Sequence, residues 1–134
     1  MYLLDTNICI YAMKGKFPAL AEKLLRIAPS EIFVSSVTVG ELEYGAAKSK
    51  WGDRSRNVMN IFLSPYTVIP FDEKDARTFG KIRALLNRQG MPIGPYDLQI
   101  AAQGLSRNLT VITHNVGEFS RVPNLTVEDW TLSM

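Results

Sequence analysis

Short apolar segments alternate with longer amphipathic ones along this chain. Strands are expected at residues 2–5, 32–34, 67–69 and 109–113, with a short fifth around residues 125–128. Longer segments in which apolar residues recur every three or four positions lie between these strands, which is typical of helices. Strands separated by helices predict right-handed crossovers and a parallel sheet covered on both faces. The pattern therefore indicates an α/β fold.

The helices are expected at residues 7–14, 18–28, 38–48, 55–63 and 96–106, and from an N-cap at Asp72 to Gly90. In the last of these, the charges of Glu73 and Asp75 favour the helix dipole. The apolar stripe of that helix is expected to comprise Ala76, Phe79, Ile82 and Leu86. A second amphipathic stripe, on the helix at residues 18–28, consists of Leu20, Leu24 and Ile27.

The composition is that of a folded globular chain. The 134 residues suffice for one domain, and 46% hydrophobic with 21% charged residues argues against disorder. No apolar stretch approaches the roughly 18 to 20 residues of a membrane span, and no signal peptide precedes the first strand, so we expect a cytoplasmic protein. The single cysteine, Cys9, is expected to be buried and structural. A net charge of +2 permits nucleic-acid binding without arguing for it.

Asp5 stands at the tip of the first expected strand. In open α/β sheets the carboxyl ends of the strands are where ligands bind. The simpler alternative is helix capping, because Asp5, Thr6 and Asn7 are all good N-caps for the next helix. Asp5 alone does not decide between these two roles.

Two further acids fall on helices at positions where a solvent-exposed face is not expected. Glu41 shares a helical stripe with Val37 and Tyr44, so it is either a partly buried carboxylate that needs a partner or a residue at the rim of the face. Asp97 lies in the first turn of a nearly apolar helix, where an aspartate commonly serves the helix dipole. Each acid alone can be explained without a function, Glu41 as a residue at the rim of its helix face and Asp97 as a charge that favours the helix dipole.

Taken together, the three acids favour a metal site. In a parallel sheet, Asp5, Glu41 and Asp97 can all meet at the carboxyl edge. Two unit charges about 4 Å apart repel by about 4 kcal/mol at an effective dielectric of 20, and a divalent cation removes that cost. Oxygen ligands without a histidine or cysteine cluster favour Mg²⁺ or Mn²⁺. Metal-assisted hydrolysis of a phosphodiester is the natural reaction of such a site.

Polar residues also follow the fourth expected strand, which ends at Thr113. Asn115 could serve as a neutral oxygen ligand or position a water, and Glu118 could supply a further acid. Alternatively, the segment is only a turn. His114 is the only histidine and is expected to be a surface or packing residue.

Basic residues gather around one tryptophan. Lys48, Lys50, Arg54 and Arg56 bracket Trp51, an arrangement that could hold phosphates and stack a base. The alternative is a solvent-exposed connection between helices with Trp51 packed inward. Arg83 and Arg88 are further candidates for phosphate contacts.

The chain resembles PIN-domain ribonucleases, particularly the VapC toxins of bacterial VapBC toxin-antitoxin modules. The resemblance is carried by Leu4-Asp5-Thr6-Asn7, Gly40-Glu41-Leu42 and Pro92-Ile93-Gly94-Pro95-Tyr96-Asp97, in this order and spacing. It implies a single PIN domain over residues 1–134, folded as a three-layer α/β/α sandwich with a central, mostly parallel twisted sheet of four to five strands. It also implies an endoribonuclease dependent on Mg²⁺ or Mn²⁺.

The resemblance further implies the site and the partners. Asp5, Glu41 and Asp97 match the catalytic and metal-binding acids, with Thr6, Asn7, Thr113 and Asn115 in support. The family often has aspartate where Asn115 stands, and Glu118 occupies the place of a later acid. Homodimerisation, inhibition by a VapB antitoxin and structured RNA such as tRNA as the substrate are expected on the same basis.

Two other classes of function remain open at this stage. One is a Mg²⁺-dependent phosphohydrolase that acts through a phospho-aspartate, although the second acid of such chemistry would have to stand where Asn7 does. The other is a non-catalytic module that binds RNA or a partner, in which the acids are caps and rim charges.

Overall fold

The computed structural model describes residues 1–133 and contains five parallel strands in one sheet. The strands are β1 (Tyr2–Leu4), β2 (Ile32–Ser35), β3 (Thr67–Ile69), β4 (Thr110–Ile112) and β5 (Val127–Glu128). Their order across the sheet is β3-β2-β1-β4-β5, so the direction of winding reverses between β1 and β4. Ligands bind at the carboxyl ends of strands beside such a reversal. The predicted parallel α/β fold is confirmed.

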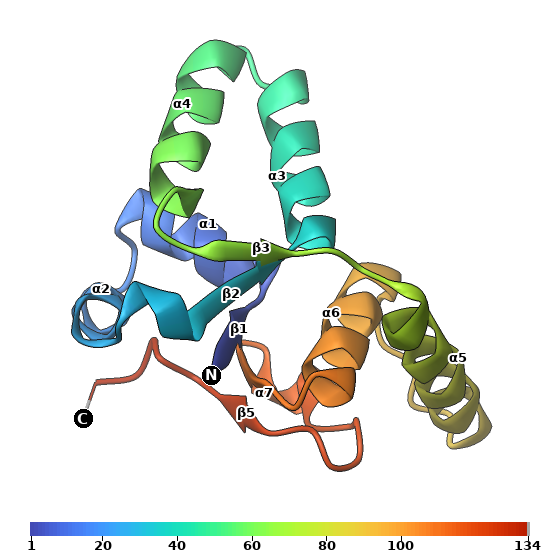
Figure 1. Ribbon diagram of the computed structural model, residues 1–134. Coiled ribbons are helices and arrows are strands. Elements are labelled where there is room, and N and C mark those ends of the chain that lie inside the picture. The colour runs from blue at the N-terminus through green and yellow to red at the C-terminus, as the bar shows by residue number, and fades with distance from the viewer. Residues whose placement is uncertain (134) are drawn as a thin grey trace.

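Helices connect the strands and cover both faces of the sheet (Figure 1). They are α1 (Thr6–Lys14), α2 (Pro18–Arg26), α3 (Ser36–Lys48), α4 (Gly52–Leu63), α5 (Glu73–Arg88), α6 (Pro95–Ser106) and α7 (Val116–Phe119), with a 3₁₀ turn at Pro29–Glu31. The helices α3 and α4 pack side by side, as do α5 and α6. These layers form the expected α/β/α sandwich.

Alternating side chains of the strands divide the core into two parts. Leu3 and Val111 belong to the cluster under α5, α6 and α7, whereas Leu4 and Ile112 belong to the cluster under α1 to α4. Successive residues of a strand point to opposite faces of the sheet, so a strand covered on both sides is apolar throughout. Cys9 is fully buried in the second cluster, as expected.

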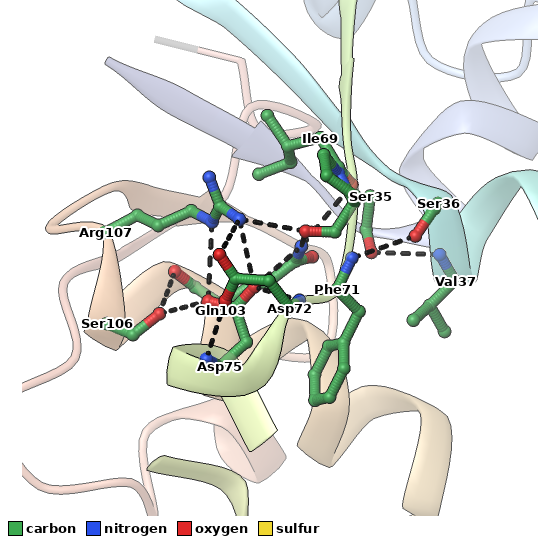
Figure 2. A network of polar contacts seen from close by, with 11 residues as sticks. Ser35, Ser36, Val37, Ile69, Phe71, Asp72, Asp75, Gln103, Ser106 and Arg107 are labelled. Carbon is green, nitrogen blue, oxygen red and sulfur yellow. Dashed lines mark hydrogen bonds and ion pairs between the residues drawn. The ribbon is translucent and has the colours of Figure 1, made fainter. Parts of the chain in front are cut away.

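A buried polar network fixes α5 against α6 (Figure 2). The Asp75 side chain is fully buried and accepts hydrogen bonds from the Ser106 hydroxyl and the Arg107 guanidinium. Asp72 and Asp75 also form a capping box at the start of α5. Burial alone would raise the pKa of Asp75, but its hydrogen bonds to Arg107 and Ser106 hold that pKa below the ordinary value. The predicted N-cap at Asp72 is confirmed.

The apolar stripe of α5 differs from the prediction at its first position. Ala76 is exposed, and the buried stripe begins one residue earlier, at Asp75, before it continues through Phe79, Ile82 and Leu86. The spacing of 75, 79, 82 and 86 also fits a helix, but a carboxylate is not expected in a stripe of this kind. Arg107, which is distant in the sequence, makes the burial of Asp75 possible.

Several predicted boundaries shift by one to three residues. The helix α3 begins at Ser36 rather than at residue 38, because the Ser35 hydroxyl accepts a hydrogen bond from Val37 N and caps it. The helix α4 begins at Gly52 rather than at residue 55. The segment after β4 contains the short helix α7 in addition to a turn. Within residues 1–133, no helix has the length and apolar character needed to cross a membrane.

Candidate active site

Asp5 lies immediately after β1 and caps α1. Its Oδ1 atom accepts a hydrogen bond from Ile8 N at 2.8 Å, and its own N–H donates to the Ile112 carbonyl at 3.0 Å. Burial raises the pKa of Asp5 to about 6, with Glu41 and Asp129 adding to the rise and hydrogen bonds from Thr113 and Ile8 opposing it. Asp5 is therefore both an N-cap and a nearly inaccessible carboxylate under electrostatic repulsion.

Glu41 projects from α3 toward the start of α1. Its Oε1 atom accepts a hydrogen bond from the Thr6 hydroxyl at 2.6 Å, and the Thr6 hydroxyl lies 3.0 Å from that of Thr38. Thr6 and Thr38 are both buried, whereas Glu41 is half-buried. This pair of threonines holds the carboxylate in one orientation beside Asp5.

Asp97 lies in the first turn of α6. Burial raises its pKa to about 7, and the negative charges of Glu118, Asp5 and Glu41 add to the rise. An acid whose pKa is raised both by burial and by specific neighbouring charges is a candidate for a functional site. Asp5 after β1, Glu41 on α3 and Asp97 on α6 thus lie near enough to one another to interact electrostatically.

The donor set fits a hard divalent cation. Three carboxylates that repel one another supply oxygen ligands, and a cation would favour their ionised forms. Within residues 1–133, no three carboxylate, histidine or cysteine side chains are close enough together to surround one ion as they stand. Mg²⁺ commonly binds through one or two carboxylates and retains several waters, so direct contact with all three is not required.

Glu118, whose charge acts on Asp97, links Asn115 to the start of α6. Glu118 accepts hydrogen bonds from Gly94 N at 2.9 Å and from Asn115 Nδ2 at 2.6 Å. Gly94 is the N-cap residue of α6 and has no capping side chain of its own, so the Glu118 carboxylate satisfies one of the free N–H groups at this helix end. The Thr113 hydroxyl accepts a hydrogen bond from Asn115 N at 2.9 Å and so fixes the turn that follows β4.

His114, in the turn that follows β4, packs against a different set of residues. Its Nδ1 lies 3.0 Å from Asp129 Oδ2 and 3.0 Å from the Thr131 hydroxyl, and its ring lies against those of Tyr11 and Phe17. The expectation of a surface or packing residue agrees with these contacts. The sequence reasoning missed Asp129, whose charge acts on Asp5, because nothing in its local pattern sets it apart.

A groove of about 800 Å³ lies beside Glu41. It runs between α1, α3 and the first turn of α6, and its walls carry Thr6, Asn7, Ile10, Lys14, Val37, Gly40, Glu41, Tyr44, Gly45, Lys48, Tyr96 and Gln99. Asn7, predicted as a supporting residue, is exposed on this wall. Of the predicted basic residues, only Lys48 lies in the groove.

Comparisons with known proteins identify the family of this chain. A profile of the PIN domain matches residues 2–125. The tRNA(fMet)-specific endonuclease VapC of Shigella flexneri is 43% identical over 130 residues, which cover 97% of this chain and 98% of the relative. Ribonuclease VapC2 of Rickettsia felis is 38% identical over 131 residues, or 97% of this chain and 98% of the relative. The chain belongs to the VapC family of PIN-domain proteins.

Solved structures of VapBC complexes share the fold. The DNA-bound VapBC from Salmonella typhimurium matches with a TM-score of 0.91 and 41% identity, covering 96% of this chain and 97% of the solved one. VapBC2 from Rickettsia felis, bound to a DNA fragment from its promoter, matches with a TM-score of 0.90 and 37% identity, covering 96% and 98%. The resemblance drawn from the three sequence motifs is thereby confirmed.

The remaining basic candidates of this VapC-family chain lie in two places. Trp51 stands between α3 and α4 and is 62% exposed, so the alternative in which it packs inward is wrong. Lys50 Nζ lies 5.5 Å and Arg54 Cζ 6.0 Å from the centre of its ring. Arg83 and Arg88 are exposed on α5, apart from that cluster. Arg56 pairs with Glu43 at 3.1 Å.

Proposed function

We propose that this chain, acting as one PIN domain, is the toxin component of a type II toxin-antitoxin system and cuts RNA as an endoribonuclease dependent on Mg²⁺ or Mn²⁺. The observation that carries the proposal is the repulsion among Asp5, Glu41 and Asp97: in addition to burial, Glu41 raises the pKa of Asp5, and both of these acids raise the pKa of Asp97. Structured RNA, and tRNA in particular, is the proposed substrate, because one relative is named a tRNA(fMet)-specific endonuclease.

The residues of the site have distinct tasks in this proposal. Asp5, Glu41 and Asp97 would hold the ion, while Thr6 orients Glu41 through its hydrogen bond of 2.6 Å. Glu118, together with Asn115, fixes the turn that delivers Asp97. When bound, the ion would neutralise the phosphate and activate a water for attack. His114 is engaged with Asp129 and Thr131 and takes no part in the reaction.

The proposed partner is a VapB-like antitoxin, because solved relatives at 37% and 41% identity are VapBC complexes. A basic side chain of the antitoxin that entered the carboxylate pocket would relieve the same repulsion as a cation. We further propose that the chain forms a homodimer and that its release from the antitoxin arrests translation and growth. Neither a small-molecule phosphohydrolase nor a non-catalytic module has support among relatives that are named nucleases.

Incubation of the purified chain with total tRNA tests the proposal. Cleavage is expected with Mg²⁺ or Mn²⁺, and it should stop on addition of EDTA and in Asp97→Asn. Products with 5′-phosphate and 3′-hydroxyl ends are expected, because water rather than the RNA's own 2′-hydroxyl attacks the phosphorus. Ends with a 2′,3′-cyclic phosphate would refute this mechanism, and the absence of RNA cleavage under all conditions would refute the function.

A further inference from the structure

The groove beside Glu41 is lined by side chains that suit a strand of nucleic acid. Tyr44 on α3 and Tyr96 on α6 both line it, and they are 67% and 55% exposed. Aromatic faces that are open to solvent can stack unpaired bases without regard to sequence. The two tyrosines therefore supply stacking surfaces on two of the groove's three walls.

The charges of the groove change sign along its length. Glu41 is the only acid in its lining, whereas Lys14 and Lys48, the last residues of α1 and α3, are its only cations. Lys48 Nζ lies 5.0 Å from the centre of the Tyr44 ring, so a positive charge stands beside a stacking surface. Neither lysine forms an ion pair with any residue in the range 1–133. Both cations are thus available to phosphates.

Two glycines leave the backbone of α3 open to the groove at two positions. Gly40 and Gly45 line the groove from inside this helix, where glycine is less stable than alanine. An added Cβ atom would meet nothing within 4 Å at either position. Gly104 in α6 differs, because a Cβ there would lie 2.6 Å from Val111 Cγ2. Packing within the chain explains Gly104, but it does not explain the two glycines of the groove.

We propose that this groove binds a single-stranded segment of the RNA substrate, next to the bond that is cut. The bases stack on Tyr44 and Tyr96, and the phosphates lie near Lys14 and Lys48. The RNA strand comes close to the backbone of α3 at Gly40 and Gly45. The inference rests on the proposed ribonuclease function and adds how the RNA is held. Single-stranded RNA is favoured over a duplex because stacking requires unpaired bases.

A pair of matched glycine variants tests the proposal. Gly45→Leu places a bulky side chain in the groove, whereas Gly80→Leu makes the same change on the exposed face of α5, where a Cβ also meets nothing within 4 Å. Both variants should melt at or above the temperature of the parent, because leucine favours a helix. The dissociation constant for a labelled single-stranded RNA of about 12 nucleotides, within the usual site sizes for single strands, should be measured by fluorescence anisotropy in EDTA. It should rise about tenfold or more in Gly45→Leu and less than about twofold in Gly80→Leu, because only the first variant blocks the path of the strand.

A lysine pair tests the charges independently of the glycines. Lys48→Gln should reduce the slope of log affinity against log salt by about 0.7, the value for one phosphate contact on a single strand. Lys81→Gln, an exposed change on α5, should leave the slope unaltered. If Gly45→Leu and Lys48→Gln bind the RNA like their controls while the parent still cuts tRNA, the groove proposal is wrong and the ribonuclease function stands.

Two other outcomes would also overturn the groove proposal. If Gly45→Leu binds the RNA normally but no longer binds the antitoxin, the groove is a binding site for a peptide segment of the antitoxin. If the parent cuts no RNA at all, the proposed function fails, and the groove proposal fails with it.

Discussion

Replacing Asp97 with asparagine should stabilise the metal-free protein above neutral pH although it removes a proposed catalytic acid. The reason is that the pKa of Asp97 is raised to about 7 by burial and by the charges of Glu118, Asp5 and Glu41. The side-chain amide introduced by Asp97→Asn would still be able to donate a hydrogen bond to Glu118, as the protonated carboxyl does. The substitution therefore removes the charge with little change in shape.

The size of the effect follows from the shift in pKa. A rise from 3.8 to about 7 is about three units, or about 4 kcal/mol at 1.36 kcal/mol per unit. Because Asp97 is half-exposed, solvent screening reduces this to about 1 to 2 kcal/mol. For a chain of this length that corresponds to a rise in melting temperature of about 3 to 10 °C.

The effect should depend on pH with a definite sign. The folded protein keeps the Asp97 proton up to about pH 7, whereas the unfolded chain releases it near 3.8. The folded state thus binds more protons in this window, so the parent loses stability as pH rises through it. Asparagine does not titrate, and the advantage of the variant should be absent below about pH 4 and complete above about pH 7.

Thermal melts in EDTA from about pH 5 to pH 8.5 would measure this difference. Asp53→Asn, an exposed aspartate in the first turn of α4, serves as the control and should change the free energy of unfolding by less than about 0.5 kcal/mol. Added Mg²⁺ should stabilise the parent more than Asp97→Asn, because only the parent keeps all three carboxylates. An Asp97→Asn variant that is less stable than the parent in EDTA at about pH 8 would contradict the proposed repulsion.

The remaining predictions concern other parts of the molecule. Asp5→Asn and Glu41→Gln should each abolish RNA cleavage with the circular dichroism spectrum unchanged, and near-normal activity in either would remove that residue from the site. Arg107→Leu should lower the free energy of unfolding by about 3 kcal/mol in urea titrations, because it leaves the Asp75 carboxylate buried without its cation. Asp75→Asn should restore much of that loss in the double variant, and if it does not, the pair is not coupled. His114→Ala should leave kcat within a few fold of the parent value, and a loss of several hundredfold would show that it acts in the reaction.

Much of the fold was predictable from the sequence because its signals are local. Apolar strands covered on both faces, and a helix introduced by Asp72, can be recognised from neighbouring residues alone. The short helix α7 was not predicted, since its four residues are fewer than the helical period needs to become visible. Boundaries such as the start of α3 depended on which of two adjacent serines caps the helix, and the pattern of apolar residues does not distinguish them.

Some features of the site also follow from the local sequence, and others depend on the tertiary structure. The sequence by itself placed Asp5 at a strand tip and Asp97 in the first turn of a helix, because each position follows from local periodicity. Only the tertiary structure decided that Glu118 binds Gly94 N at the start of α6, that Asp75 is buried against Arg107, and that Trp51 is exposed. These outcomes depend on which distant elements pack together, since burial and charge repulsion act through space rather than along the chain.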